Sequence, residues 1–300
     1  MCAMSPRLLR PIASGVHPEA ADWRARVIAN GGTVSGSTLQ AVSRFCASIS
    51  AAGIRDRFYR LGIFAGNSDA SLNAVRTPLF RGPSRTGTQY GGTTDTNNNF
   101  VAGDYAENNG LLGNGSTKWL NTELDLNGAG LTTAAPGMHM SAVTTAYTIG
   151  ANVNNIMVAA VNAAVNQRFW VVHGSNNVPT TEVTSQLGFG SATGAATKQI
   201  AATNGAAIPG GLWLVSRSSH TDIRLYNGAV EEASSVGDIS GGPNVPTNPM
   251  TVFVRWNGSA FFGFVNQRIR AYSVGLSMTA QQVSDFNTAM AALQTALGRT

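Results

Sequence analysis

The stretch T-D-I-R-L-Y-N-G-A-V-E-E-A-S, residues 221–234, decides the fold class. Asn227-Gly228 stands near its middle, and Asn-Gly readily adopts the positive φ angles that a two-residue hairpin turn requires. The residues on both sides are typical of strands. The stretch therefore predicts two antiparallel strands joined by a tight turn.

A second hairpin is predicted in T-V-F-V-R-W-N-G-S-A-F-F-G-F, residues 251–264, around another Asn-Gly pair. Strand side chains alternate between two faces, so Val252, Val254 and Trp256 should share one face. The same period of two begins near Arg57, and clusters of Gly, Asn, Pro, Ser and Thr punctuate the chain from there. This pattern predicts a many-stranded antiparallel β-sandwich.

Helical patterns flank the predicted sandwich at both ends of the chain. The first helix is expected at residues 18–29, with a proline in its first turn, and the second at residues 38–52. Ser37 and Gln40 form a capping-box pattern for the second helix. Each helix has one apolar face, which must pack on the sandwich or on a neighbouring molecule.

A third helix is predicted near the C-terminus, beginning with a Thr279–Gln282 capping box and ending at Gly298. Its apolar residues recur at helical spacing and should be buried. They are Val283, Phe286, Met290, Leu293 and Leu297. The expected organisation is an Arg-rich arm and helical region at residues 1–56, followed by the sandwich and its C-terminal helix at residues 57–300.

Charge is sparse and unevenly distributed. Charged residues make up 12% of the sequence, about half of the roughly 25% usual in soluble domains. Residues 1–90 contain 11 arginines, no lysine and four acidic residues, a net charge of +7. These arginines form either a solvated face or a docking surface for an acidic partner, but no basic run that predicts nucleic-acid binding. The candidates for partner binding are Arg10, Arg24, Arg26, Arg55, Arg57 and Arg60.

Three pieces of the sandwich region together resemble concanavalin A-like lectin and glucanase domains. They are G-N-G-S-T-K-W-L-N-T-E-L at residues 113–124, the stretch with R-L-Y-x-G at residues 211–230, and residues 263–286. The segment at residues 51–120 resembles the leading part of tailed-bacteriophage virion proteins that carry such a sandwich. This resemblance implies a structural protein of the particle, either a head decoration or fibre protein or a tail protein.

Glucanases of this fold are similar in carrying E-x-D-x-(x)-E on one strand. Here Glu123 and Asp125 match the first two positions, and both would share one face if this stretch were a strand. The third position is Asn127, whose amide cannot act as the acid or base that retaining hydrolysis requires. The sequence therefore predicts a protein that is not an enzyme.

Two further kinds of site were considered. Asp95, Asn97 and Asn99 match D-x-N-x-N, but Phe100 and Ala106 exclude an EF-hand. A looser calcium loop that adds Asp104 and an Asn-rich surface turn are the two alternatives, and no other cofactor is expected. Glycan binding needs exposed aromatic side chains, which are otherwise core residues; the candidates are Trp119, Trp170, Trp213 and Tyr226.

The sequence analysis leads to a virion structural protein that acts by binding other virion proteins and copies of itself, with a host-surface glycan as a further partner. The alternative is a carbohydrate-binding or glycan-hydrolysing sandwich protein. We identify no secretory signal and no apolar stretch long enough for a membrane helix, so synthesis in the host cytoplasm and no membrane insertion are expected.

Overall fold

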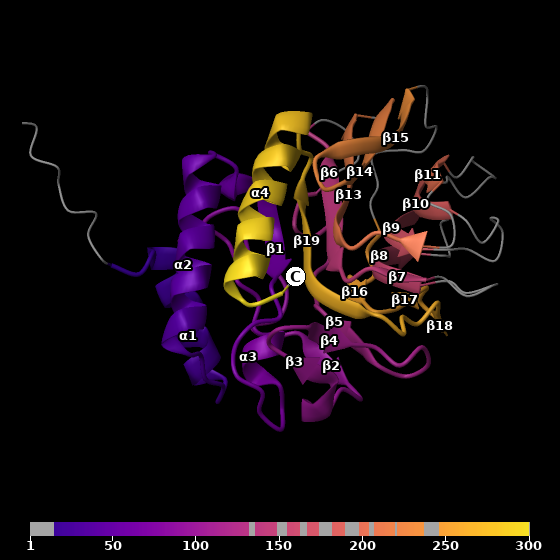
Figure 1. The fold of residues 1–300 in the computed structure, drawn as a ribbon. Helices are drawn as coiled ribbons and strands as arrows, with labels where there is room; N and C mark the ends of the chain where they lie inside the picture. The colour runs from indigo at the N-terminus through magenta and orange to yellow at the C-terminus, as the bar shows by residue number, and fades with distance from the viewer. Residues whose placement is uncertain are drawn as a thin grey trace, which may run out of the picture.

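The computed structural model describes residues 15–131, 136–148, 155–162, 167–173, 182–189, 198–203, 207–219, 221–236 and 246–299. In parts of residues 162–173 and throughout 182–189 and 198–203, the description is limited to the backbone. Two antiparallel sheets and the terminal helices form three layers, with the helices on one side of the first sheet and the second sheet on its other side (Figure 1).

The first sheet, called sheet A, lies in the middle layer and follows the order β15-β14-β13-β6-β19-β4-β3, with β1 also paired to β19. Its central strand β6 pairs with both β13 and β19 in antiparallel register. The strands of sheet A are β1 (Phe58–Gly62), β3 (Tyr105–Ala106), β4 (Gly110–Leu112), β6 (Met138–Thr144), β13 (Gly211–Ser219), β14 (Asp222–Asn227), β15 (Val230–Val236) and β19 (Arg268–Leu276).

The second sheet, called sheet B, follows the order β11-β10-β9-β8-β16-β5-β2. Its strands are β2 (Thr96–Asn98), β5 (Trp119–Asn121), β8 (Asn155–Asn162), β9 (Gln167–His173), β10 (Glu182–Phe189), β11 (Lys198–Thr203) and β16 (Thr251–Val252). Two small sheets complete the strands, β7 (Tyr147–Thr148) with β12 (Ala207–Ile208), and β17 (Arg255–Trp256) with β18 (Phe261–Phe262).

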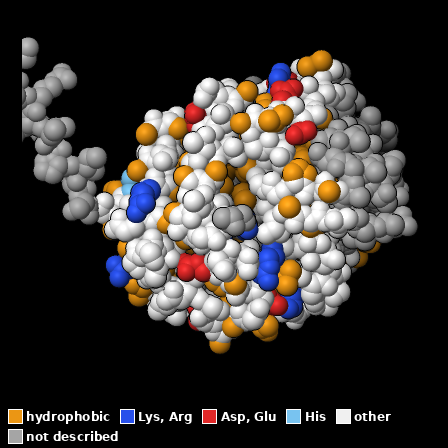
Figure 2. Space-filling view, viewed as in Figure 1, with side chains coloured by type: hydrophobic (Ala, Val, Ile, Leu, Met, Phe, Trp, Pro, Cys, Tyr) orange, Lys and Arg blue, Asp and Glu red, His pale blue; other side chains and the backbone are white. Residues whose placement is uncertain are grey.

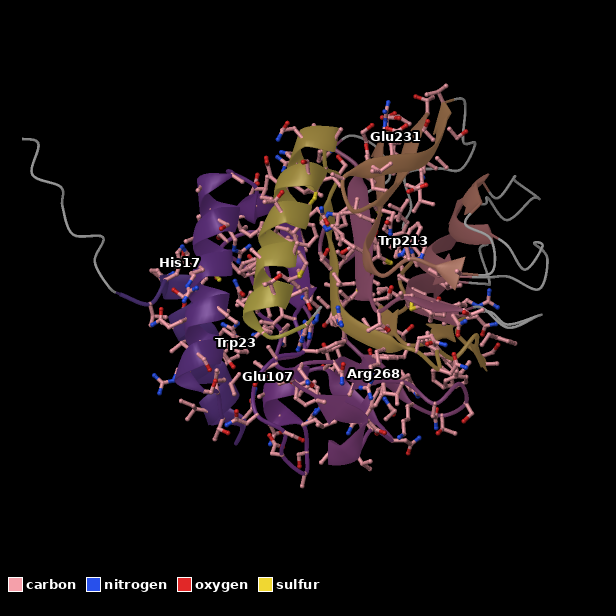
Figure 3. The ribbon with its side chains drawn as sticks, in the orientation of Figure 1. His17, Trp23, Glu107, Trp213, Glu231 and Arg268 are labelled. Carbon is pink, nitrogen blue, oxygen red and sulfur yellow. The ribbon has the colours of Figure 1, made fainter. Side chains whose placement is uncertain are left out.

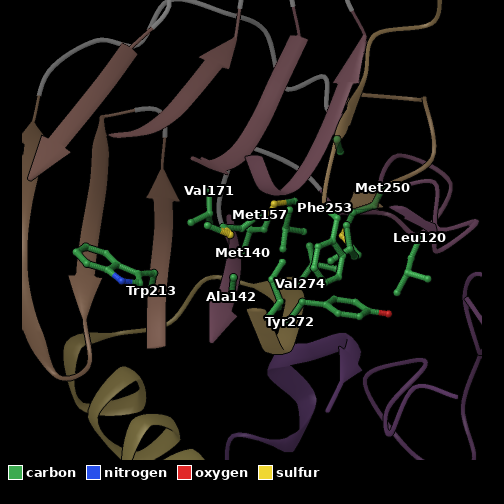
Figure 4. Packing of buried hydrophobic residues seen from close by; sticks show 14 of the residues in the cluster. Leu120, Met140, Ala142, Met157, Val171, Trp213, Met250, Phe253, Tyr272 and Val274 are labelled. Carbon is green, nitrogen blue, oxygen red and sulfur yellow. The ribbon is translucent and has the colours of Figure 1, made fainter. Parts of the chain in front are cut away.

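The main hydrophobic core fills the space between sheets A and B (Figure 4). Sheet A contributes Met140, Trp213 and Tyr272, all fully buried, and sheet B contributes Leu120 and Phe169. Inward-facing side chains of two packed sheets are what hold a sandwich together. The predicted fold class, a mainly β antiparallel sandwich with helices at both ends, is confirmed.

A second core covers the outer face of sheet A. Helices α1 (Pro18–Ala29), α2 (Gly36–Ala51) and α4 (Ala280–Ala296) bury their apolar stripes there, against Phe58 and Leu214 of the strands. The apolar faces of the N-terminal helices were expected to pack either on the sandwich or on a neighbouring molecule. In the structure they pack on sheet A of the same chain. The remaining helical elements are short: α3 (Asn73–Arg76), η1 (Arg55–Arg57) and η2 (Ala102–Asp104).

The helix boundaries follow local capping chemistry. The first helix covers the predicted residues, and the C-terminal helix has the predicted Thr279–Gln282 capping box with Phe286, Met290 and Leu293 buried. The second helix begins earlier than predicted, because Ser35 accepts from the Thr38 N–H at 3.0 Å and is the N-cap in place of Ser37.

Both predicted hairpins form, with different details. Gly228 takes a φ of 60° between β14 and β15, whereas Asn227 is the last residue of β14. The second hairpin is the small sheet of β17 and β18. Phe253 has a φ of 72°, which interrupts the predicted continuous strand between Val252 and Trp256. In the described residues, we find no helix with the length and apolar character needed to cross a membrane.

Candidate functional site

The candidate site is a group of half-buried aromatic residues on sheet B and the neighbouring β17–β18 hairpin. Strand β5 supplies Trp119 and Asn121, which alternate with Leu120. Leu120 is fully buried in the main core. Because side chains alternate along a strand, Trp119 and Asn121 lie on the other face of β5 from Leu120, where the half-buried Trp119 still packs against the main core.

The β17–β18 hairpin brings two more aromatic rings to the same place. Trp256 and Phe261 are direct cross-strand partners, and such pairs place their side chains on one face of the hairpin. The turn is held by Asn257, whose side-chain oxygen accepts from the N–H groups of Ser259 at 2.9 Å and Ala260 at 2.8 Å.

Together these residues line an open cavity of about 250 Å³. The ring centroid of Phe261 is 4.5 Å from that of Trp119 and 4.5 Å from that of Trp256, with ring planes inclined by 41° and 39°. All three rings are partly exposed. The described residues that line it are Trp119, Asn121, Pro249, Thr251, Trp256 and Phe261. An accessible aromatic cavity with a few polar groups has the composition of a small-molecule binding site.

The structure separates the four predicted glycan-binding residues. Trp119 lines the cavity, whereas Trp213 (labelled in Figure 3) and Tyr226 are buried, so predicting them as exposed platforms was wrong. Trp213 belongs to the main core, where its indole N–H donates to the Pro209 carbonyl at 3.1 Å. The side chain of Trp170 lies outside the described residues.

Trp256 and Phe261 are the residues that the sequence analysis did not identify as binding candidates. The signal was present in the chain, because both flank the Asn257-Gly258 turn. A hairpin at that turn makes them cross-strand neighbours. Their proximity to Trp119 could not be read from the same pattern, because the hairpin and β5 belong to different sheets.

Three of the six predicted partner-binding arginines have partners that are distant in the sequence of the same chain. Arg60 is fully buried and forms an ion pair with Asp95, so its prediction as a docking residue was wrong. Arg55 pairs with Glu19 at 2.7 Å. Arg26 donates to the carbonyls of Pro78 and Leu79. These side chains fasten the N-terminal helices and the strands that follow them to the rest of the fold.

The other three arginines have different positions. Arg24 is exposed on α1, Arg57 is partly exposed and pairs with Asp56 at 3.2 Å, and Arg10 lies outside the described residues. On the face shown in Figure 2, basic side chains lie as separate spots among uncharged atoms. A single basic patch is not seen on that face.

The predicted calcium ligands are engaged with protein groups. Asp95 is buried against Arg60, and the oxygens of Asp104 accept from the Val101 N–H and the Lys118 ammonium group. Asn97 bonds the backbone of Phe100, and Asn99 donates to the Thr117 carbonyl. Over the described ranges, no three acidic, histidine or cysteine side chains are grouped to hold a metal ion.

The E-x-D-x-N segment is a turn rather than the predicted strand. Glu123 has a φ of 57°, outside the strand region, and its carboxylate accepts from the Thr96 hydroxyl at 2.7 Å. Asp125 caps the following turn by accepting from the Asn127 N–H at 2.9 Å. Strand alternation therefore does not apply to the two carboxylates.

Two other cavities are more polar than the aromatic one. A cavity of about 300 Å³ lies at the start of α4, where Arg224 is paired with Asp222 and Glu231. A cavity of about 610 Å³ contains Arg299, whose guanidinium donates to the carbonyls of Phe64 and Glu107. The charges of Arg224 and Arg299 thus have partners within the fold.

Comparisons with known proteins give only partial and distant structural matches. No protein-family model matches the chain, nor does any curated protein. Among solved structures, the NanB sialidase of Streptococcus pneumoniae aligns at 13% identity and a TM-score of 0.40, over 54% of this chain and 25% of that one. This chain thus matches only a quarter of the sialidase.

Two smaller domains align similarly. The Ruminococcus gnavus IT-sialidase CBM40 domain has 9% identity and a TM-score of 0.41, over 56% of this chain and 92% of that one. The binding domain of botulinum neurotoxin DC has 9% identity and a TM-score of 0.40, over 59% of this chain and 42% of that one.

Proposed function

We propose that this protein is a non-catalytic carbohydrate-binding protein, and that the sugar binds in the cavity of Trp119, Trp256 and Phe261. The observation that carries the proposal is the meeting of three half-buried aromatic rings from two different sheets in one open cavity. Aromatic side chains left accessible to solvent are costly, and a group of them marks a binding surface.

The cavity suits a sugar because a pyranose ring has both apolar C–H faces and hydroxyl groups. The aromatic rings offer flat apolar surfaces for the C–H faces. Hydrogen-bond donors for the hydroxyl groups come from the amide of Asn121 and the indole N–H groups of the two tryptophans. Within the described part of the chain, no residue accepts a hydrogen bond from these donor groups.

The proposal excludes hydrolysis at this cavity on chemical grounds. Glycoside hydrolysis usually requires a pair of carboxyl groups in distinct roles. The described lining of the cavity contains none. The chemistry that the residues can perform is therefore stacking and hydrogen bonding, which hold a ligand without changing it.

Replacing Trp119 or Trp256 with alanine is expected to weaken glycan binding at least about tenfold, since each change removes one aromatic wall. The measurement is a glycan array screen of the wild type, followed by titration calorimetry of the best ligand with each variant. Phe262→Ala is the matched control, because Phe262 is 43% exposed in the same hairpin but does not line the cavity. Equal losses in all three variants, or none in the tryptophan variants, would contradict the proposal.

A structural role in a tailed-bacteriophage particle is a second proposal. It is supported by the sequence resemblance at residues 51–120 and by the outward surface of α1, where Arg24 is exposed and Ile28 is 54% exposed. Such a protein would sit in the virion as a head decoration, fibre or tail component, and could present the sugar site from there.

Mass spectrometry of purified particles is expected to detect this chain in a fixed ratio to the major virion proteins. Arg24→Glu combined with Ile28→Ser should lower its incorporation, because both changes alter the outward surface of α1 while leaving its buried face intact. The control is the Trp119→Ala variant, which should incorporate normally. Absence of the chain from particles would rule out the virion role without affecting the sugar site.

A further inference from the structure

We infer that the sugar taken by the aromatic cavity is uncharged, and that the site discriminates against sugars bearing a carboxylate. This inference rests on the proposed carbohydrate-binding function and names the class of ligand. Its first support is the lining itself. None of the six residues that line the cavity carries an ionisable side chain.

The second support is the orientation of the charged side chains that neighbour the lining residues in the sequence. Three charged residues stand within two positions of a lining residue, namely Lys118, Glu123 and Arg255. Lys118 alternates with Trp119 and pairs with Asp104. Arg255 alternates with Trp256, and its guanidinium lies 4.9 Å from the ring centroid of Phe262. Lys118, which precedes β5, is thus neutralised by Asp104, and strand alternation turns Arg255 away from the cavity face.

The third support is the charge that lies closest in the sequence to Asn121 on the loop that follows it. The carboxylate of Glu123 is exposed, and the Glu123 N–H donates to the Asn121 side-chain oxygen at 2.9 Å. This contact leaves the amide N–H₂ of Asn121 as the group that can reach a ligand. The formal charge next to Asn121 is therefore negative, and it repels a carboxylate on a ligand.

Desolvation adds to this discrimination. A carboxylate that enters an apolar cavity loses its hydration, and without a cation this loss is much larger than that of a hydroxyl group. A hydroxyl group needs one donor or acceptor, which Asn121 or an indole N–H provides. The cavity of about 250 Å³ lies below the range of roughly 300–1,000 Å³ typical of sites for drug-sized ligands. It therefore suits one sugar ring, with the rest of a glycan outside.

The test compares matched pairs of sugars that differ only in the charged group. Glucose, galactose and mannose oligosaccharides are titrated against the corresponding uronate oligosaccharides, with calorimetry at physiological salt. In the wild type, at least one neutral sugar should bind at least about tenfold more tightly than its uronate. Asn121→Arg should raise uronate affinity relative to the neutral sugar, because it places a cation at the cavity wall.

Arg255→Ala is the matched control, since it removes a nearby cation that faces away from the cavity, and it should leave the ratio of affinities unchanged. Uronate binding as tight as neutral binding in the wild type, or uronate binding that Arg255→Ala abolishes, would overturn the inference and leave the proposed function standing. Absence of binding by every sugar of both classes would instead overturn the proposed function, and the inference with it.

Discussion

Replacing Asp95 with alanine is expected to lower the free energy of unfolding by about 3–5 kcal/mol, because it leaves a buried guanidinium without its counter-charge. Asp95 and Arg60 are 1% and 0% exposed and are joined by a contact of 2.6 Å. The Tyr272 hydroxyl donates to the second carboxylate oxygen at 2.6 Å. Urea unfolding of the wild type and the variant at neutral pH measures the difference.

The same side chains tie distant parts of the chain together. Arg60 lies on β1, Tyr272 lies on β19, and the Arg60 guanidinium also donates to the carbonyls of Tyr90 and Gly92. Burial alone would lower the pKa of Arg60, but Asp95 and Tyr272 outweigh it and raise that pKa. Arginine keeps its charge even when it is desolvated, so removing Asp95 leaves a buried cation without its counter-charge, which is why the loss should be large.

Two controls separate this effect from the loss of any ion pair. Asp22→Ala breaks the pair with Arg85, in which the side chains are 44% and 41% exposed, and should cost less than about 1 kcal/mol. Arg60→Met combined with Asp95→Leu removes both charges and should be less destabilising than Asp95→Ala alone. A loss in Asp95→Ala no larger than that in Asp22→Ala would show that the buried pair is unimportant.

The sequence predicted most successfully those elements whose limits depend on a few neighbouring residues. Helix α4 begins at its Thr279–Gln282 capping box, and α1 has a proline at its start. Both signals act within one turn of the chain. The capping error at α2 has the same local origin, since Ser35 and Ser37 both offer an oxygen and only geometry chooses between them.

Predictions failed where contacts between distant residues decided the outcome. Arg60 was placed on the surface because its sequence neighbours gave no sign of Asp95, 35 positions away. The segment around Glu123 was compared with the glucanase strand that carries E-x-D-x-(x)-E, but it is a turn in which Leu124 and Leu126 are both buried in the main core. Alternating apolar residues fit a buried turn as well as a strand.

The candidate site was predictable only in part for the same reason. The sequence analysis offered aromatic residues as the candidates for sugar binding, and burial distinguishes Trp119 from Trp213 and Tyr226. Whether a side chain is buried depends on the face of the sheet that it occupies. That face is set by the pairing register between strands that lie far apart in the sequence. The cavity forms because β5 lies beside the β17–β18 hairpin, and no local sequence pattern predicts that arrangement.

His139 couples the stability of the sandwich to pH. It is fully buried on β6, and burial lowers its pKa to about 4 from the ordinary value of 6.5. Its Nδ1 contacts the Leu276 carbonyl at 2.7 Å, and its Nε2 contacts the Ser273 hydroxyl at 2.9 Å. A carbonyl only accepts, so Nδ1 carries the proton and Nε2 accepts from the hydroxyl. The folded state therefore holds a neutral imidazole.

Acidification from pH 7 to pH 4 is accordingly expected to remove about 3 kcal/mol of unfolding free energy through His139 alone. The unfolded chain binds a proton at this residue below pH 6.5 and the folded chain does not until about pH 4, so the contribution is complete above pH 6.5 and lost as pH falls toward 4. The measurement is urea unfolding of the wild type and His139→Gln at intervals from pH 7 to pH 4.5. Glutamine cannot titrate, so the stability advantage of the wild type over the variant should shrink steadily through this range. Parallel curves for the two proteins would show that the imidazole is not held neutral by the fold.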